Sequence, residues 1–221
     1  LSWSLGALGF IYCVLGEWDK GEQYLEEALD LAQRLNHFQQ IAYASSNLAW
    51  LYGVEKGEYQ KARKLLEKAV KTLEKAGAKY DQAWVSIALS RIYIELGKIQ
   101  EANDLLTSGH KLALEVKDKW SIALAEAVRG IQFRAQKKWE ESIEHFEKSL
   151  QTYESINARR WIAYDFAINL CDYAGVYLER DQEGDRKKAY SLLNEALEIF
   201  QKLGAKKDIE RIIAKKKLLT A

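Results

Sequence analysis

The sequence of 221 residues contains no proline and no methionine, and it has only two cysteines and three histidines. Because proline interrupts helices, its absence leaves every stretch of the chain compatible with a helix. No stretch reaches the ~18 uninterrupted apolar residues that a membrane-spanning helix needs, and no signal-peptide pattern is seen. The sequence therefore predicts a helical protein without a membrane span.

The few cysteines and histidines are too scattered to form a reactive site. Cys13 and Cys171 lie far apart in the chain, so we expect free buried thiols in a reducing, cytoplasmic location rather than a disulfide. His37, His110 and His145 show no metal-ligand spacing. Phosphate loops and dinucleotide-binding glycine patterns are absent, and the carboxylates follow the polar stripes of helices. We predict no catalytic residue, no metal and no cofactor, and hence a protein that is not an enzyme.

The charge balance excludes a strong general attraction to polyanions. The chain has 33 basic and 32 acidic residues, a formal net charge of +1. We therefore expect neither nucleic acid nor membrane as a partner. Residues 204–221 carry six basic and two acidic residues, a local charge of +4. We interpret this last segment as a solvated helix that covers the end of the hydrophobic core, in preference to a basic binding patch.

The dominant feature of the sequence is a unit of about 40 residues that occurs five times. Each copy contains a similar run, seen most clearly in Gly57–Ala69. The positions that start this run are Gly16, Gly57, Gly97, Lys137 and Gly184. They are 41, 40, 40 and 47 residues apart. A fixed period of this length is typical of a solenoid, in which each unit packs on its neighbours.

Apolar residues three and four apart predict two helices in each unit. Residues that tolerate the left-handed conformation stand where these helices should end, above all glycine and asparagine. We expect helices at about 1–15, 18–35, 38–54, 59–76, 80–96, 99–116, 120–136, 139–156, 159–180, 186–203 and 206–219. The repeats are then 1–36, 37–77, 78–117, 118–157 and 158–204, followed by a capping helix at 205–221. Since Leu1 already lies inside a helical pattern, we expect this single solenoid, residues 1–221, to be a fragment of a larger protein.

The pattern of the first unit resembles the tetratricopeptide repeat (TPR). Residues 8–29 read L-G-x-x-Y-x-x-x-G-x-W-x-x-G-x-x-x-L-x-x-A-L. The second unit fits with one extra residue before Gly57, the fourth fits less well, and the first helix of the fifth is hard to register. The resemblance covers essentially the whole chain. It implies an all-α fold, a right-handed α-solenoid of five TPR-like helix pairs plus a C-terminal capping helix.

The period departs from the ~34 residues of a standard TPR. The surplus of about six residues falls where one helix ends and the next begins, so each helix is about one turn longer. Such long repeats resemble the TPR sensor regions of signal-transducing ATPases, including LuxR-type regulators. They also resemble peptide-pheromone receptors and kinesin light chains. In these families the repeats bind a ligand or a protein.

The resemblance also implies where a ligand would bind, because the first helix of each TPR pair lines the concave face. Aromatic residues with arginine are frequent anchors of binding faces. The predicted groove residues are Trp3, Phe10, Tyr43, Trp50, Trp84, Arg91, Glu95, Arg134 and Tyr164. The alternative is that the tryptophans are ordinary core residues of the longer helices. For the two arginines the groove is favoured, since a buried arginine needs a partner.

Three functions fit this pattern. The leading hypothesis is a non-catalytic scaffold or sensor domain that binds a protein or peptide partner in the concave groove. The second is a sensor for a small molecule, such as an oligosaccharide, in a signalling ATPase or transcription regulator. The third is a self-association module that uses the groove or the uncovered face of the first helix. The repeat pattern is specific for the fold and does not identify the ligand.

Overall fold

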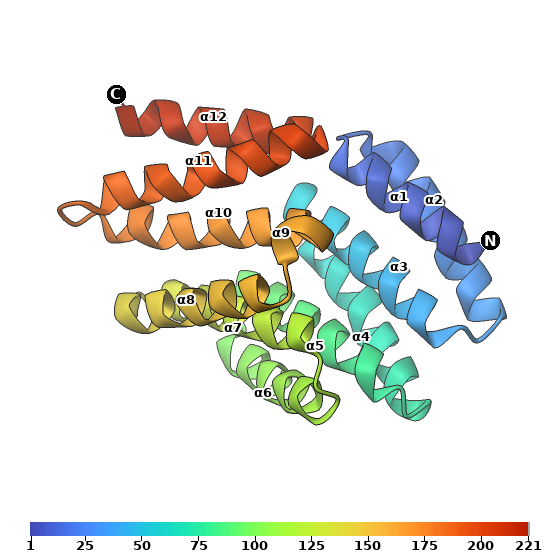
Figure 1. The fold of residues 1–221 in the computed structure, drawn as a ribbon. Helices are drawn as coiled ribbons and strands as arrows, with labels where there is room; N and C mark the ends of the chain where they lie inside the picture. The colour runs from blue at the N-terminus through green and yellow to red at the C-terminus, as the bar shows by residue number, and fades with distance from the viewer. Residues whose placement is uncertain (221) are drawn as a thin grey trace. The chain divides into compact units, whose positions relative to one another are not determined.

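The computed structural model describes residues 1–220, apart from the side chains of Trp161, Leu218 and Thr220. Every regular element in this range is a helix (Figure 1). Within the same range, no helix combines the length and the apolarity needed to cross a bilayer.

The helices form five successive pairs and a final single helix, so the predicted all-α solenoid of helix pairs is confirmed. The first helices of the pairs are α1 (Ser2–Val14), α3 (Phe38–Trp50), α5 (Lys79–Glu95), α7 (Lys119–Ala135) and α10 (Ala163–Arg180). The second helices are α2 (Trp18–Arg34), α4 (Tyr59–Lys75), α6 (Ile99–Glu115), α8 (Trp139–Ser155) and α11 (Asp185–Leu203). The last helix is α12 (Lys206–Thr220).

Contacts between residues divide the chain into two compact units. Unit 1 comprises Leu1–Cys13 and Glu17–Ala125, and unit 2 comprises Val14–Gly16 and Glu126–Ala221. Unit 1 thus holds the first three helix pairs and the start of α7, whereas unit 2 holds α8 and all later helices. That all five repeats form one continuous solenoid stays a prediction.

The helices end at the residues that the sequence predicts. Gly16, Gly57 and Gly97 have φ values of 82°, 72° and 72°, in the left-handed region that glycine favours. Residues with a side chain also take this conformation at equivalent ends, and these are Asn36, Lys117, Lys137, Asn157 and Asp181. The turns after α6 and α7 are therefore of the same kind as the glycine turns, although lysine carries a steric cost there.

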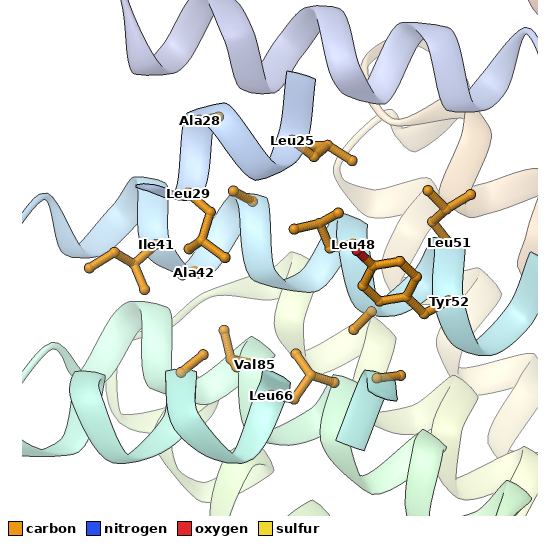
Figure 2. Packing of buried hydrophobic residues seen from close by; sticks show 14 of the residues in the cluster. Leu25, Ala28, Leu29, Ile41, Ala42, Leu48, Leu51, Tyr52, Leu66 and Val85 are labelled. Atoms are coloured by element: carbon orange, nitrogen blue, oxygen red, sulfur yellow. The ribbon is translucent and has the colours of Figure 1, made fainter. Parts of the chain in front are cut away.

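The core of unit 1 is built from side chains that interleave between successive helices. Leu25 and Leu29 of α2, Leu48 of α3 and Leu66 of α4 are nearly or fully buried (Figure 2). Small residues let the helices approach closely, as α1 and α2 do at Gly9, where a Cβ atom would lie 2.6 Å from Cγ of Leu25. The alternation of large and small side chains gives close packing.

The second pair contains an irregularity that corrects the predicted helix at 38–54. The α-helix ends at Trp50 and continues as a π-helical segment, η1 (Leu51–Glu55). The spacing explains this difference. Tyr52 and Gly57 are five residues apart, whereas Tyr93 and Gly97 in the next pair are four apart. A π turn holds one residue more than an α turn, so η1 accommodates the insertion while Tyr52 stays buried.

The predicted helix at 159–180 in unit 2 is also wrong in one respect, because it is broken. A short helix, α9 (Ala158–Trp161), is separated from α10 by Ile162, whose backbone is not helical (φ −133°, ψ 44°). Packing outweighs helix propensity at this point. Ala158 is fully buried, and the guanidinium of Arg159 lies 4.6 Å from the ring centroid of Phe166. Nothing in the local sequence marks this break.

Candidate functional site

Unit 1 carries one large aromatic side chain at the same register of each of its complete first helices. These are Trp3 of α1, Tyr43 of α3 and Trp84 of α5, and Trp120 follows at the start of α7. We name these four residues the aromatic row. The rings of Trp3 and Tyr43 are 5.8 Å apart at 40°, and those of Trp84 and Trp120 are 5.6 Å apart at 65°. Both arrangements are favourable for aromatic pairs.

Exposure varies strongly along the aromatic row. Trp3 is 48% exposed, Tyr43 and Trp120 are half-buried, and Trp84 is 8% exposed. The tryptophans are thus not all alike. Trp84 belongs to the packed core of unit 1, whereas Trp3 offers almost half of its surface to a ligand.

The exposed end of the row is held rigidly. A Cβ atom on Gly6 would lie only 3.2 Å from a ring carbon of Tyr43, so the tyrosine ring lies directly on the backbone of α1. Beneath it Gln40 is fully buried, and its Oε1 accepts a hydrogen bond of 3.3 Å from the hydroxyl of Ser2. The Tyr43 ring therefore forms a preorganised apolar surface beside Trp3, because it cannot move toward α1.

A row of buried polar residues accompanies the aromatic row. Gln40 and Asp81 stand three residues before Tyr43 and Trp84, and Ser121 occupies the same register of α7. Within the described part of the chain, Nε2 of Gln40 and Oδ1 of Asp81 make no hydrogen bond. Burial raises the pKa of Asp81, and a hydrogen bond from the Trp84 indole opposes this shift. Sequence reasoning missed this row, although its spacing of 41 and 40 residues follows the repeat.

A second set of predicted residues occupies another register of the same helices. This set consists of Phe10, Trp50 and Arg91. Each of them directly follows a small residue at which two helices meet, and all three are half-buried. Glu95, one turn after Arg91, is exposed. Burial raises the pKa of Tyr59 on α4, and Glu95 raises it further while Arg91 opposes this. The charges of Arg91 and Glu95 are thus close enough to Tyr59 to influence it.

The two predicted residues of unit 2 have internal partners. Nη1 of Arg134 donates a hydrogen bond of 2.9 Å to the carbonyl of Asp172, and its Nε lies 3.6 Å from Glu179. Tyr164 is 8% exposed, and its hydroxyl donates a hydrogen bond of 3.1 Å to Asp208 on α12. Both side chains therefore contribute to packing inside unit 2.

The described residues offer no assembly for metal chemistry, since nowhere among them do three His, Cys, Asp or Glu side chains converge. The arrangement in unit 1 is instead a row of rings near the start of the first helices, with the charges of Arg91 and Glu95 near the end of α5. Such a surface can hold apolar or aromatic groups of a ligand and pair with its charges.

Comparison with family models finds the tetratricopeptide repeat at residues 1–75 and 54–115. The two matches together span residues 1–115, more than half of the 221 residues. A comparison with curated proteins found no match.

Several solved structures share the fold. BtubC (BKLC) from P. vanneervenii matches with a TM-score of 0.59 and 20% identity, covering 88% of this chain and 78% of that one. A Signal Transduction ATPase with Numerous Domains (STAND) protein with a tetratricopeptide repeat sensor, from Pyrococcus horikoshii, matches with a TM-score of 0.57 and 15% identity. That match covers 96% of this chain but only 36% of the STAND protein. The nearly identical TPR-like repeats of a putative kinesin light chain from Podosopora anserina match with a TM-score of 0.54 and 20% identity, covering 90% and 94%. At these identities the likeness concerns the fold alone.

Proposed function

Because the chain belongs to the tetratricopeptide-repeat family, we propose that unit 1 binds a peptide segment of a protein partner along its first helices. Repeats of this family generally serve protein–protein interaction or sensing, as non-catalytic scaffolds. The observation that supports the proposal most directly is the aromatic row, with Trp3 almost half exposed beside a Tyr43 ring fixed against α1.

The physical argument rests on preorganisation. Rings that are already fixed lose little conformational entropy on binding, and burying an exposed tryptophan surface contributes strongly to affinity. The charges of Arg91 and Glu95 lie about two and three turns further along α5 than the aromatic row, where a bound peptide could reach them. Arg91 would pair with a carboxylate, and Glu95 with a basic residue. We therefore expect a segment with aromatic or branched apolar side chains and, some residues away, one acidic residue.

The test is a selection followed by a measurement. Peptides of 16 residues selected from a random display library on the wild-type protein would be titrated by calorimetry against the Trp3→Ala/Tyr43→Ala variant. We expect a loss of affinity of about tenfold or more, because truncation of central aromatic anchors typically has effects of this size. The matched control is Leu114→Ala, at an apolar side chain of α6 that is 55% exposed and lies outside the row.

Equal binding by the wild type and by a folded Trp3→Ala/Tyr43→Ala variant would refute the peptide site. Circular dichroism would establish that the variant is folded. A Leu114→Ala variant that lost as much affinity would show that the effect does not belong to the aromatic row.

A small-molecule ligand is the second candidate function, and the buried polar row favours it. Nε2 of Gln40 and Oδ1 of Asp81 lie next to aromatic rings and form no hydrogen bond among the described residues. Because both atoms are buried, a hydroxyl group of an oligosaccharide would reach them only if the first helices moved apart, whereas its rings could stack directly on the exposed Trp3. A thermal shift with oligosaccharides but not with the selected peptides would favour this function over the first.

Self-association is the third candidate, and α1 carries the observation behind it. Leu8 and Ile11 are 43% and 50% exposed, whereas their equivalents, Leu48 of α3 and Leu51 of η1, are 1% and 0% exposed. This stripe of α1 thus has the composition of a helix interface, although the described residues leave almost half of it exposed.

A further inference from the structure

The outer face of α4 carries a line of lysines. Lys64, Lys68, Lys71 and Lys75 are exposed and follow one another at intervals of four, three and four residues, so they share one side of the helix. We name these four residues the lysine ridge. It extends over about 17 Å at ~1.5 Å per residue. Glu67 and Thr72 lie among these lysines on the same helix.

The charges of the lysine ridge are not neutralised inside the protein. None of its four ammonium groups forms an ion pair with any residue of the described chain. Glu67, an acidic residue among these lysines, is already engaged. It accepts a hydrogen bond of 2.6 Å from the Tyr93 hydroxyl, and Nη1 of Arg63 lies 3.8 Å from it. The ridge therefore keeps its full positive charge toward solvent.

Charge is distributed unevenly between α4 and α2. Residues 59–75 hold six basic and two acidic side chains, a net +4, whereas residues 18–34 hold two basic and five acidic ones, a net −3. Lys61, one turn before the ridge, shows what such a lysine binds. Its Nζ donates a hydrogen bond of 3.1 Å to Glu22 of α2. At its N-terminal end, this face of α4 therefore already binds a carboxylate from another helix.

We propose that the lysine ridge is a docking surface for an acidic α-helix of a partner protein. A helix with carboxylates at intervals of four, three and four residues has the same rise per residue, so its charges stay in register with the ammonium groups. One partner helix, about 10 Å in diameter with its side chains, is wide enough to cover a single row of side chains such as the lysine ridge.

The surroundings favour this partner over a nucleic acid or an anionic membrane. Lys61 brings α2 alongside α4 through Glu22, and α2 exposes Glu27 and Asp30. A phosphate backbone or a lipid surface would spread over both helices and meet these carboxylates. No aromatic side chain lies among the residues of the ridge and those between them, Glu67 and Thr72, although such side chains stack bases in single-strand binding and anchor proteins to bilayers.

The probe is an 18-residue helical peptide with glutamates at the matching intervals and alanine or glutamine elsewhere. Its affinity would be measured by fluorescence anisotropy at about 20 mM and about 150 mM salt. We expect measurable binding at the lower concentration that weakens at the higher one, because exposed charges are screened. In the Lys64→Gln/Lys68→Gln/Lys71→Gln/Lys75→Gln variant the affinity should fall about tenfold or more, through the loss of four charge pairs.

The matched control removes four exposed lysines elsewhere. It combines Lys111→Gln, Lys187→Gln, Lys202→Gln and Lys206→Gln, which gives the same net charge. This variant and the Trp3→Ala/Tyr43→Ala variant should bind the peptide as the wild type does, so that the ridge is tested separately from the aromatic row. Melting curves followed by circular dichroism would verify that every variant is folded.

Four results would overturn the proposal. They are no binding at low salt, equal binding of a peptide with the same composition in scrambled order, an equal loss in the control variant, and tighter binding to a 20-nucleotide single strand or to phosphatidylserine vesicles than to the peptide.

Discussion

At the scale of single residues, the clearest electrostatic centre is Glu22. Burial acts to raise the pKa of this carboxyl, but hydrogen bonds from Lys56 and Lys61, helped by the nearby Tyr52 hydroxyl, outweigh it and lower the pKa to about 2. The same network holds Tyr52, with the Nζ of Lys61 3.6 Å from its ring centroid. A charged carboxylate therefore joins α2 to the π-helical segment and to α4.

We predict that Glu22→Gln lowers the free energy of unfolding at pH 7 by about 2 kcal/mol, less than the full pKa shift implies because the side chain is partly hydrated. A carboxyl with a depressed pKa stabilises the folded state above its ordinary value of 4.5, and this contribution is lost as the pH falls toward 2. Urea unfolding of both proteins at a series of pH values measures it. The difference between them should shrink as the pH falls from about 4.5 to about 2.

The control for this experiment is Glu17→Gln. Glu17 also accepts a hydrogen bond from a lysine, Lys20 at 2.6 Å, but both side chains are about half exposed or more. Exposed pairs of this kind contribute little, so we expect a change of less than about 0.5 kcal/mol. A Glu22→Gln variant as stable as the Glu17→Gln variant would contradict the role assigned to Glu22.

At the scale of helices, a repeated hydrogen bond joins each of several first helices to the second helix before it. The hydroxyls of Tyr52, Tyr93 and Tyr173 donate to Glu26, Glu67 and Glu147 at 2.9, 2.6 and 3.2 Å. Every pair is separated by 26 residues. In the fourth pair Phe133 stands at the tyrosine position and stacks on His145 at 5.2 Å instead.

We predict that Tyr93→Phe destabilises the protein by about 1 kcal/mol, because it removes one hydrogen bond to a charged acceptor at a half-buried site. Chemical denaturation measures the loss. Tyr24→Phe is the control, since Tyr24 stacks on Tyr12 at 5.4 Å and no hydrogen bond of its hydroxyl is seen among the described residues. Equal stabilities of the two variants would show that the bond between α4 and α5 contributes nothing measurable.

The sequence predicts the helices well because the same pattern of apolar residues and helix-ending residues occurs in all five repeats. Glycine or asparagine at a fixed distance from apolar columns determines where most helices end. The two errors have local causes that periodicity does not contain. The insertion before Gly57 is visible in the spacing, but whether a loop or a π turn takes it up depends on keeping Tyr52 buried. The break at Ile162 depends on packing around Ala158 and has no turn residue.

The candidate site was less predictable than the fold. Repeat register identifies which side chains share a face, so Trp3, Tyr43 and Trp84 were found together. The register does not determine how deeply each side chain is buried. Trp3 is 48% exposed, whereas Trp84 is 8% exposed. Depth depends on neighbours such as Trp120, whose register differs from that of the other three. The unpaired lysines of the ridge were equally invisible, because a lysine pattern alone does not show whether acidic partners are within reach.

At the scale of the whole molecule, the uncovered stripe of α1 bears on the oligomeric state. The positions of Leu8 and Ile11 have equivalents in each complete helix pair of unit 1. Only in the first pair are the residues at these positions exposed. The equivalents of Leu8 and Ile11 in α5, Leu89 and Ile92, are only 2% and 3% exposed. No residue of α1 carries a charge, so two copies of this helix can pack together without repulsion.

We predict that the protein self-associates at high concentration and that Leu8→Glu/Ile11→Glu abolishes this, because a buried carboxylate without a partner opposes burial of the stripe. Sedimentation velocity at protein concentrations from micromolar to several hundred micromolar measures the association. The matched variant is Leu114→Glu, which adds charge at a leucine that is also exposed but lies on α6. It should associate as the wild type does.

A wild-type protein that stays monomeric throughout the range would rule out self-association through α1 and leave the stripe to a helix of another kind. Association that survives in the Leu8→Glu/Ile11→Glu variant would place the contact elsewhere on the molecule.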